Sequence, residues 1–333
     1  MIRAAILSFA HLHANSYAQC LHRHSGIEFC AVYDEDSACG GEQAQRYGAK
    51  FYQDAMELLR GEKPDFAIVC AENVRHCNLV LACAEAGVHC MCEKPIATTV
   101  GDANEMIKAC TDAGVHLMTC FPVRYSPPVV RFREMVRGGR AGLPLAASCT
   151  NHGRMPPGWF LNKELAGGGA VIDHTVHVAD LLRWILDREA VRVYAEVGHG
   201  LLHPGLGIDD VGLLTIEYED GFFATLDTSW SRPAIFPTWG DVTIRMTGTD
   251  GVLQVDAFQQ ELEVYSDRDG RAEWQHWGEN IDMLMIDDFV NHLLRNEPPA
   301  ITGEDGLRAL ETALCAYQSA KTNKPVDIND IRC

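Results

Sequence analysis

The sequence contains no apolar stretch long enough to cross a membrane, because no run of about 18 consecutive apolar residues occurs in it. Its first segment, residues 1–7, lacks the extended apolar core of a secretory signal peptide. Low-complexity segments and repeats of solenoid length are missing as well. We therefore expect a cytoplasmic globular protein with no membrane partner.

Basic residues are scarce. The chain has 28 lysines and arginines against 46 aspartates and glutamates, which gives a formal net charge of -18. Such a chain repels the phosphate backbone of nucleic acids and the anionic surface of membranes, so neither is an expected partner. An anionic cofactor could still bind where local backbone dipoles overcome this field.

Cysteine pairs with the spacing of a zinc site are also missing, although the chain has 13 cysteines. Ten of them lie at or before Cys120, mostly within apolar runs, and none form a C-x-x-C pair. Free cysteines of this kind behave as small buried hydrophobic residues. We predict no resident metal.

The length of 333 residues, with 47% hydrophobic and 22% charged residues, indicates two globular domains. We expect the first over residues 1–122, where short apolar strands alternate with helices, as in a doubly wound parallel Rossmann sheet. The expected strands are 4–7, 28–33, 66–71, 89–92 and 116–121. The expected helices are 14–24, 37–47, 75–86 and 100–113, and the last three end at glycines suited to a left-handed cap.

The second domain is expected over residues 123–333, where strands follow one another with glycine-containing turns. Such a pattern predicts an α+β domain with an open, mainly antiparallel sheet and one helical face. The expected strands are 144–150, 191–197, 211–217, 222–230, 242–247, 252–255 and 262–265. The expected helices are 129–137, 169–186, 281–295 and 304–321.

The turn after the first strand contains none of the three glycines of a dinucleotide-binding fingerprint. It reads Ser8-Phe9-Ala10-His11-Leu12-His13. It still joins a strand to a helix, and Asp34 closes the second strand, where a carboxylate can hold a ribose hydroxyl. Acidic neighbours and the lack of a nearby arginine favour NAD over NADP. The alternative is an ordinary strand–helix turn without a ligand.

Glu93-Lys94-Pro95 follows the apolar run His89–Cys92, so Lys94 lies at the carboxyl end of a strand, where open α/β sheets bind ligands. The proline after it allows a cis peptide bond. A lysine in this place can hydrogen-bond a substrate hydroxyl and favour its ionised form. The alternative is a surface lysine in a turn.

The helix expected from Gly169 presents Asp173, His177 and Asp180 at helical spacing. A carboxylate one turn from an imidazole can orient it and stabilise its protonated form, which suits general-base chemistry on an alcohol. Two alternatives remain. The polar stripe could simply be solvated, or Asp173, His174 and His177 could bind a metal.

Taken together, these motifs resemble those of the Gfo/Idh/MocA oxidoreductases. The resemblance covers nearly the whole chain, and the order and spacing of the motifs make it specific. The motifs that carry it are Asn73-Val74-Arg75-His76, Glu93-Lys94-Pro95, Arg124-Tyr125-Ser126-Pro127, Gly167-Gly168-Gly169 followed by Asp173, His177 and Asp180, and residues 303–310. Two features depart from the family pattern: the glycine-poor first turn, and Thr175 where members often have glycine.

The resemblance implies a Rossmann domain, an α+β domain whose open sheet forms a homodimer or homotetramer, and bound NAD, with NADP less favoured. It implies a catalytic set of Lys94, Asp173 and His177. The cofactor would meet Ser8, Ala10, His11, Leu12, His13, Asp34, Ala71, Glu72, Asn73, His76, Glu93 and Lys94. Candidates for substrate contacts are Arg124, Tyr125, His152, Trp159 and His174.

The expected reaction is hydride transfer between nicotinamide and a hydroxyl or keto carbon of a sugar, polyol or related alcohol. The same residues could serve an NAD-dependent lyase, epimerase or glycosidase that oxidises its substrate transiently. A sensor that kept the fold without catalysis is the third possibility, to which the missing glycines point.

Overall fold

The computed structural model describes residues 1–236, 238–259, 261–266, 271–276 and 278–332. The chain divides into two compact units. The first comprises Met1–Phe121, Glu164–Gly167 and Asp282–Leu310, and the second comprises Pro122–Lys163, Gly168–Ile281 and Glu311–Cys333. A short segment from the middle of the chain and a longer one near its end therefore pack with the N-terminal part.

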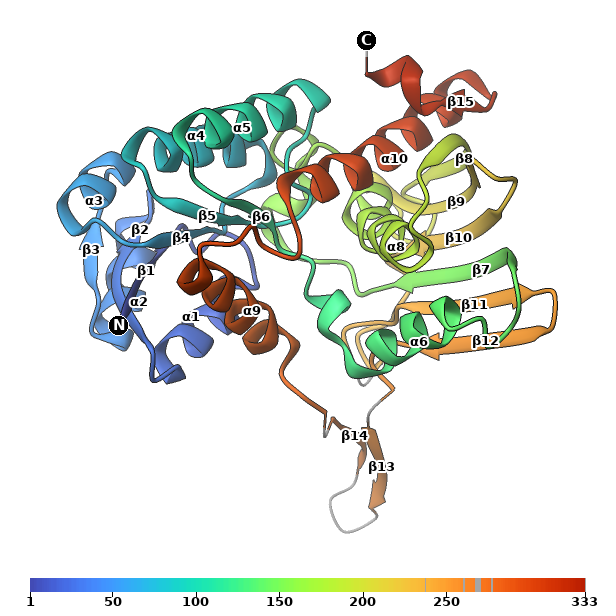
Figure 1. The fold of residues 1–333 in the computed structure, drawn as a ribbon, viewed down its shortest axis with the longest axis horizontal. Helices are drawn as coiled ribbons and strands as arrows, with labels where there is room; N and C mark the ends of the chain where they lie inside the picture. Colours follow the sequence, from blue (N-terminus) through green and yellow to red (C-terminus); the bar gives the residue numbers. More distant parts are fainter. Residues whose placement is uncertain (237, 260, 267–270, 277, 333) are drawn as a thin grey trace. The chain divides into compact units, whose positions relative to one another are not determined.

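The first unit is built on a six-stranded parallel sheet of order β3-β2-β1-β4-β5-β6 (Figure 1). Its strands are β1 (Ile2–Leu7), β2 (Ile27–Tyr33), β3 (Lys50–Tyr52), β4 (Phe66–Val69), β5 (His89–Cys92) and β6 (Leu117–Thr119). This order is that of a Rossmann fold, with the chain reversing direction across the sheet between β1 and β4. The expectation of a doubly wound parallel sheet is confirmed.

Helices cover both faces of this sheet, with α4 and α5 on one face and α1 and α9 on the other (Figure 1). The helices are α1 (Ala14–Arg23), α2 (Ser37–Tyr47), α3 (Ala55–Glu62), α4 (His76–Ala86), α5 (Val100–Ala113) and α9 (Ile281–Arg295). As predicted, α2, α4 and α5 end at Gly48, Gly87 and Gly114, each with left-handed backbone. The sequence prediction missed β3 and α3.

The second unit contains a seven-stranded mixed sheet of order β12-β11-β7-β10-β9-β8-β15. Its strands are β7 (Pro144–His152), β8 (Ala190–His199), β9 (Asp209–Tyr218), β10 (Phe223–Ser229), β11 (Thr243–Gly248), β12 (Gly251–Asp256) and β15 (Val326–Asp327). Only the pair β7 and β10 is parallel, so the sheet is mainly antiparallel, as expected. A separate hairpin of β13 (Glu261–Ser266) and β14 (Arg271–His276) precedes α9.

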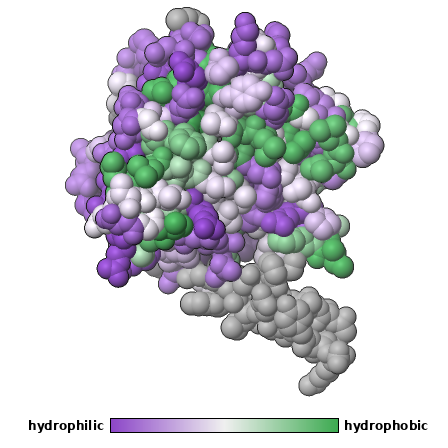
Figure 2. All heavy atoms as spheres, turned by 90° about the vertical axis from the view of Figure 1, so that its right-hand side faces the viewer, coloured by the Kyte–Doolittle hydropathy of each residue, from purple (hydrophilic) through white to green (hydrophobic). Residues whose placement is uncertain are grey.

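One face of the seven-stranded sheet packs against α6 (Pro127–Arg137) and α8 (Ala170–Leu186) and forms the core of this unit (Figure 1). Alternate residues of each strand point into this core, as the period of two requires. Two further helices are short α7 (Lys163–Ala166) and long α10 (Gly303–Thr322). On the side turned toward the viewer in Figure 2, hydrophobic residues gather in a band among polar ones.

The cysteines agree with the expectation of small buried thiols. All twelve cysteines that the structure describes are free thiols, and every one except Cys39 is buried. Among the described residues, no helix combines the length and apolar character needed to cross a membrane.

The start of α8 is held by one buried carboxylate, that of Asp209 on β9. It accepts hydrogen bonds from the backbone N–H groups of Gly169 and Val171 at 2.8 Å each, and from the Tyr317 hydroxyl at 3.1 Å. At the start of a helix, the first backbone N–H groups have no acceptor within the helix, and Asp209 supplies one. A Cβ on Gly169 would lie 1.9 Å from the Asp209 carbonyl oxygen, so glycine is required there. Glycine at position 169 thus lets the chain pass close to Asp209 before the helix begins.

We expect Asp209→Asn to lower the free energy of unfolding by about 2–4 kcal/mol, because one acceptor oxygen is replaced by a donor that faces other donors. Chemical denaturation followed by circular dichroism measures this loss. Asp330→Asn is the matched control, because Asp330 is exposed, and it should change stability by no more than about 0.5 kcal/mol. Equal effects of the two substitutions would contradict the capping role of Asp209.

Candidate active site

The first turn, residues 8–13, lies at the carboxyl end of β1, where the sheet order reverses between β1 and β4. The backbone N–H of His11 donates to the Cys70 carbonyl after β4 at 2.8 Å, and the N–H of Cys70 donates to the Leu7 carbonyl at 2.9 Å. Open α/β sheets bind their ligands at such a reversal point. The turn is therefore in the position of a cofactor site.

Ser8 adopts the backbone conformation that glycine usually supplies in this turn. Its φ angle is 77°, in the left-handed region, which costs a residue with a side chain roughly 1–2 kcal/mol. The Ser8 hydroxyl accepts a hydrogen bond from the Ala10 N–H at 3.2 Å, which partly offsets that cost. The chain thus makes a tight turn without glycine, and the missing motif does not mean a missing turn.

Asp34, at the end of β2, is tied to this turn. Its Oδ2 accepts the N–H of Phe9 at 2.7 Å, and its Oδ1 accepts the N–H of Asp36 at 2.9 Å. The carboxylate therefore aligns the first turn with the end of the neighbouring strand. Sequence reasoning assigned Asp34 only a ligand role and missed this structural one.

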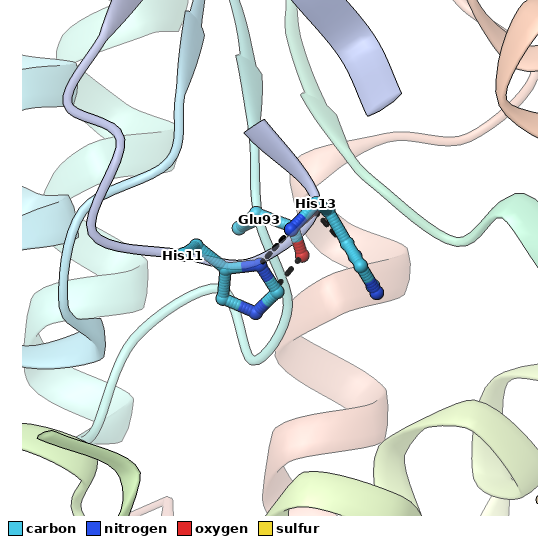
Figure 3. A group of neighbouring side chains, drawn as sticks. All are labelled: His11, His13 and Glu93. Carbon is cyan, nitrogen blue, oxygen red and sulfur yellow. Dashed lines mark hydrogen bonds and ion pairs between the residues drawn. The ribbon is translucent and has the colours of Figure 1, made fainter. Parts of the chain in front are cut away.

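Glu93, fully buried after β5, is the centre of a network that reaches the same turn (Figure 3). Its Oε1 accepts from the Tyr17 hydroxyl at 2.5 Å and lies 3.0 Å from His13 Nδ1. Its Oε2 accepts the Lys94 N–H at 3.0 Å and lies 3.8 Å from His11 Nε2. Two histidines that look misplaced in the sequence thus share one buried carboxylate.

The charges in this network stabilise one another. Burial alone would raise the pKa of Glu93, but His11 and His13 outweigh it and hold that pKa well below its usual range. Burial alone would lower the pKa of His13, yet the Glu93 carboxylate raises it above the ordinary histidine value. The pair is therefore most stable as carboxylate and imidazolium.

The same three side chains could be read as a metal site, because one ligand atom of each lies within 4.8 Å of the others. Hydrogen bonding argues against that reading. His11 Nδ1 accepts the His13 N–H at 3.2 Å, so the proton of a neutral His11 ring sits on Nε2, the atom that faces Glu93. Glu93 is meanwhile occupied by protein donors on both oxygens. The arrangement is that of a hydrogen-bond network.

The remaining cofactor candidates lie around the end of β4. His76 is fully buried, and its ring nitrogens lie 3.0 and 3.1 Å from the carbonyl oxygens of Pro95 and Ala71. The Asn73 amide donates to the Ala166 carbonyl at 2.8 Å, and Glu72 lies beside Arg75. Leu12 is exposed. His76 thus joins the loop after β4 to the loop that carries Lys94.

Lys94 follows β5 and is buried, and its peptide bond to Pro95 is cis, which is the isomer that the sequence allowed. It belongs to the first unit, whereas Asp173 and His177 belong to the second. A buried lysine directly after a parallel strand is not the surface lysine of the alternative reading.

In the second unit, the polar residues of α8 are mostly buried, which excludes a solvated stripe. Asp173, His174 and Asp180 are all buried, and His177 is the only residue from Ala170 to Leu182 with intermediate exposure. Asp173 Oδ2 accepts the Trp230 indole N–H at 3.3 Å and lies 3.3 Å from His174 Nε2.

A metal on this helix is not supported either. Within the described residues, the groups close enough to hold an ion are His11–His13–Glu93 and Cys77–Asp102–Glu105, and neither includes a residue of α8.

Two substrate candidates are held by carboxylates of their own unit. Arg124, buried, donates through Nε to Asp180 Oδ2 at 2.7 Å, pairs a second time with the same carboxylate, and lies over the Trp184 ring. His152 lies between Asp241, at 2.9 Å, and Asp227, at 3.1 Å. Its hydrogen bonds to Asp227, the larger effect, and to Asp241 raise its pKa to about 9. Both side chains therefore have structural partners that sequence spacing could not reveal.

The other three substrate candidates, Tyr125, Trp159 and His174, also belong to the second unit. Tyr125 ends a short 3-10 helix and has intermediate exposure. Trp159 stacks on Phe160, with ring centroids 3.9 Å apart. His174 is almost completely buried beside Asp173.

Two family models match the chain in succession. One, described as an oxidoreductase family with an NAD-binding Rossmann fold, matches residues 4–121. The other, the GFO/IDH/MocA C-terminal domain, matches residues 129–254. The chain is 27% identical over 300 residues to a myo-inositol 2-dehydrogenase from Thermotoga maritima, covering 87% of this chain and 88% of that protein. It is also 27% identical over 314 residues to a 1,5-anhydro-D-fructose reductase from Ensifer adhaerens, covering 92% of each.

Solved structures agree with this relationship. GenD2 from gentamicin A biosynthesis, solved in complex with NAD, superposes with a TM-score of 0.89 at 25% identity, covering 98% of this chain and 96% of that one. A probable dehydrogenase from Thermotoga maritima superposes with a TM-score of 0.85 at 25% identity, covering 99% and 100%. With both halves of the family pattern matched in order along the sequence, the chain belongs to the GFO/IDH/MocA family of NAD-binding oxidoreductases.

Proposed function

We propose that this oxidoreductase transfers hydride between NAD and a hydroxyl or keto carbon of a sugar or polyol. The observation that carries the proposal is the geometry of the first turn, where Ser8 adopts the left-handed conformation of a cofactor-binding turn. In the same chain, Lys94 follows β5, and Asp173 and His177 lie on α8. Relatives with names such as inositol dehydrogenase, anhydrofructose reductase and D-apiose dehydrogenase support a carbohydrate-like substrate.

The residues of the first unit fit the cofactor. Ser8 and Ala10 are small, the turn lies where the sheet order reverses, and Asp34 stands at the end of β2. The residues that would hold NAD are Ser8, Ala10, His11, Leu12, His13, Asp34, Ala71, Glu72, Asn73, His76, Glu93 and Lys94. When bound, NAD supplies the nicotinamide ring that accepts or returns the hydride.

One part of the argument for NAD over NADP changes. The sequence suggested that no arginine lies near Asp34–Asp36, but this is wrong, because Arg75 pairs with Glu35. Arg75 also faces Glu72 at 3.5 Å. Its charge is thus already balanced by two carboxylates, so a 2′-phosphate would still face a net acidic surface. The preference for NAD therefore rests on the acidic surface that remains after Arg75 is paired with Glu35 and Glu72.

The catalytic roles follow from the chemistry of the three side chains. Lys94 would hydrogen-bond the reacting hydroxyl and stabilise its oxygen as it loses a proton. His177, which is partly exposed on α8, would accept that proton. Asp173 would orient the pair and favour the protonated imidazole. Arg124 and His152 have carboxylate partners of their own, which argues against direct substrate binding by either.

Lys94→Ala and His177→Ala should each lower kcat at least about 100-fold, because each removes a proton-handling group. NAD reduction is measured by absorbance in a screen of polyols and sugars, with binding of NAD followed by tryptophan fluorescence. Lys108→Ala, at an exposed lysine, is the matched control and should turn over normally. Near-normal kcat in both Lys94→Ala and His177→Ala would refute the catalytic assignment.

The charge pair of His13 and Glu93 makes the stability of the first unit depend on pH. The native pKa of His13 is raised, so the pair stabilises the fold fully at pH values below the unfolded histidine pKa. That stabilisation is lost as the pH rises through the native pKa. Asp282 and Lys94 also face His13, with opposite effects on its charge.

Without cofactor, we expect wild type to exceed His13→Gln in melting temperature most clearly below a pH of about 6.5, with the difference shrinking as the pH rises further. Differential scanning fluorimetry across this range measures it. His22→Gln, on the exposed side of α1, controls for the loss of an imidazole. The same pH trend in both variants would rule out the pairing of His13 with Glu93.

We also propose that the outer face of the seven-stranded sheet binds a second copy of the chain. The exposed face carries Tyr194, Leu213, Phe223 and Val252. Leu213 is 58% exposed and Phe223 is 48% exposed, although the residues on either side of each are buried. Strand register places all four on one face. Exposed apolar side chains gathered on one face of a sheet, even among polar ones, are typical of an interaction surface.

Replacing Leu213 and Phe223 together with aspartate should convert a homodimer or homotetramer into smaller species, because charges would then be buried at the interface. Size-exclusion chromatography with light scattering gives the mass. Leu294→Asp, at an exposed leucine of the first unit, should leave the mass unchanged. A monomeric wild type, or an unaffected double variant, would contradict the proposal.

A further inference from the structure

We propose that His174 and Trp230 are positioning residues that fix the Asp173 carboxylate in its working orientation. The proposal rests on the role of Asp173 proposed above and extends it to two buried side chains of the second unit, one of which, His174, the sequence suggested as a substrate contact. Both reach the same atom, Oδ2, each at 3.3 Å. A carboxylate held at one oxygen from two directions cannot rotate freely, so the direction of Oδ1 is fixed as well.

The indole of Trp230 is itself immobile. Trp230 follows β10 and is 1% exposed, packed against Ala170 and Ile208. Its backbone N–H donates to the Asp210 carbonyl at 2.9 Å, and its carbonyl accepts from His203 Nε2 at 2.9 Å. The backbone of Trp230 is thus tied on both sides, and the indole N–H has a fixed place from which to donate.

His174 is confined by its surroundings in a different way. It is 2% exposed, and the backbone of Gly153 lies against its ring. A Cβ at Gly153 would lie 2.8 Å from His174 Cε1 and 3.1 Å from the Trp239 indole nitrogen. The ring therefore has room only because residue 153 has no side chain. This confinement holds Nε2 toward Asp173.

The donor chemistry is one-directional. An indole N–H can only donate and a carboxylate oxygen can only accept, so Trp230 always favours the ionised form of Asp173. His174 Nε2 lies 3.3 Å from the same oxygen and forms an ion pair with it when the imidazole is protonated. In this proposal His174 acts by orienting Asp173, and it does not serve as a metal ligand.

Three variants test the arrangement. Trp230→Phe removes the N–H but keeps a ring, His174→Leu removes the imidazole beside Oδ2, and His174→Gln puts a polar amide in its place. Trp184→Phe is the matched control, because it lies on the same helix but packs against Arg124 and Arg133. Circular dichroism and NAD binding by tryptophan fluorescence verify that each variant folds.

The first readout is independent of turnover. In protein labelled with ¹⁵N-tryptophan, the indole resonance that disappears in Trp230→Phe belongs to Trp230. We expect that resonance to shift and its proton to exchange at least about 10-fold faster in Asp173→Asn and in His174→Leu, because the acceptor oxygen is lost or displaced. The chemical shift of this resonance should be unchanged in Trp184→Phe. In His174→Gln it should be close to the wild-type value.

The second readout is kinetic, with myo-inositol as the probe and saturating NAD. Trp230→Phe and His174→Leu should lower kcat about 10- to 100-fold with little change in the KM for NAD, and His174→Gln should recover most of kcat. Wild-type kcat in both variants while Asp173→Asn is inactive would overturn the positioning role, as would an unmoved Trp230 resonance in Asp173→Asn. Wild-type kcat in Asp173→Asn would instead overturn the catalytic assignment. If the wild-type protein does not oxidise myo-inositol, the shift and proton exchange of the Trp230 indole resonance test the positioning role alone.

Discussion

A buried carboxylate must be hydrogen-bonded or paired, and this constraint organises candidate site residues within each of the two units. In the first unit, Glu93 draws Tyr17 and His13 onto one oxygen and the Lys94 N–H onto the other. In the second, Asp209 holds the start of α8, and Asp173 accepts from Trp230. Each carboxylate joins segments that are far apart in the sequence. The hydrogen bonds that pair its charge therefore also fix the positions of those segments.

The glycine-poor turn shows how the same function of a loop can be met by different residues. A glycine fingerprint makes a tight turn through conformational freedom. Here Ser8 takes the left-handed conformation, and Asp34 accepts the N–H of Phe9 to hold the turn beside β2. His13 then pairs with Glu93 and brings positive charge into a chain with a net charge of -18, while His11 lies beside the same carboxylate. The turn is thus organised by side-chain hydrogen bonds in place of glycine.

Partners distant in sequence changed the interpretation of several residues. Arg124 was a candidate for substrate binding, but its guanidinium is paired with Asp180, one of the three polar residues that the helix pattern had singled out. His152 lies between two carboxylates of β10 and the segment before β11. Arg75 reaches Glu35, which the sequence had placed among acidic residues without an arginine. A charged side chain recognises its partner through space, and no local pattern encodes that pairing.

The sequence by itself determined the order of strands and helices, the glycine caps of α2, α4 and α5, and the placing of Lys94 at a strand end and of Asp173 and His177 on one helix. These features depend on local periodicity and on the backbone preferences of single residues. Only the tertiary structure decided that α9 packs with the first unit, that β7 and β10 pair in parallel, and that three-residue β3 exists at all. It also decided which donors satisfy Glu93, Asp209 and Asp173. Such pairings arise from the three-dimensional packing of distant segments, where the cost of an unpaired buried charge selects the partner.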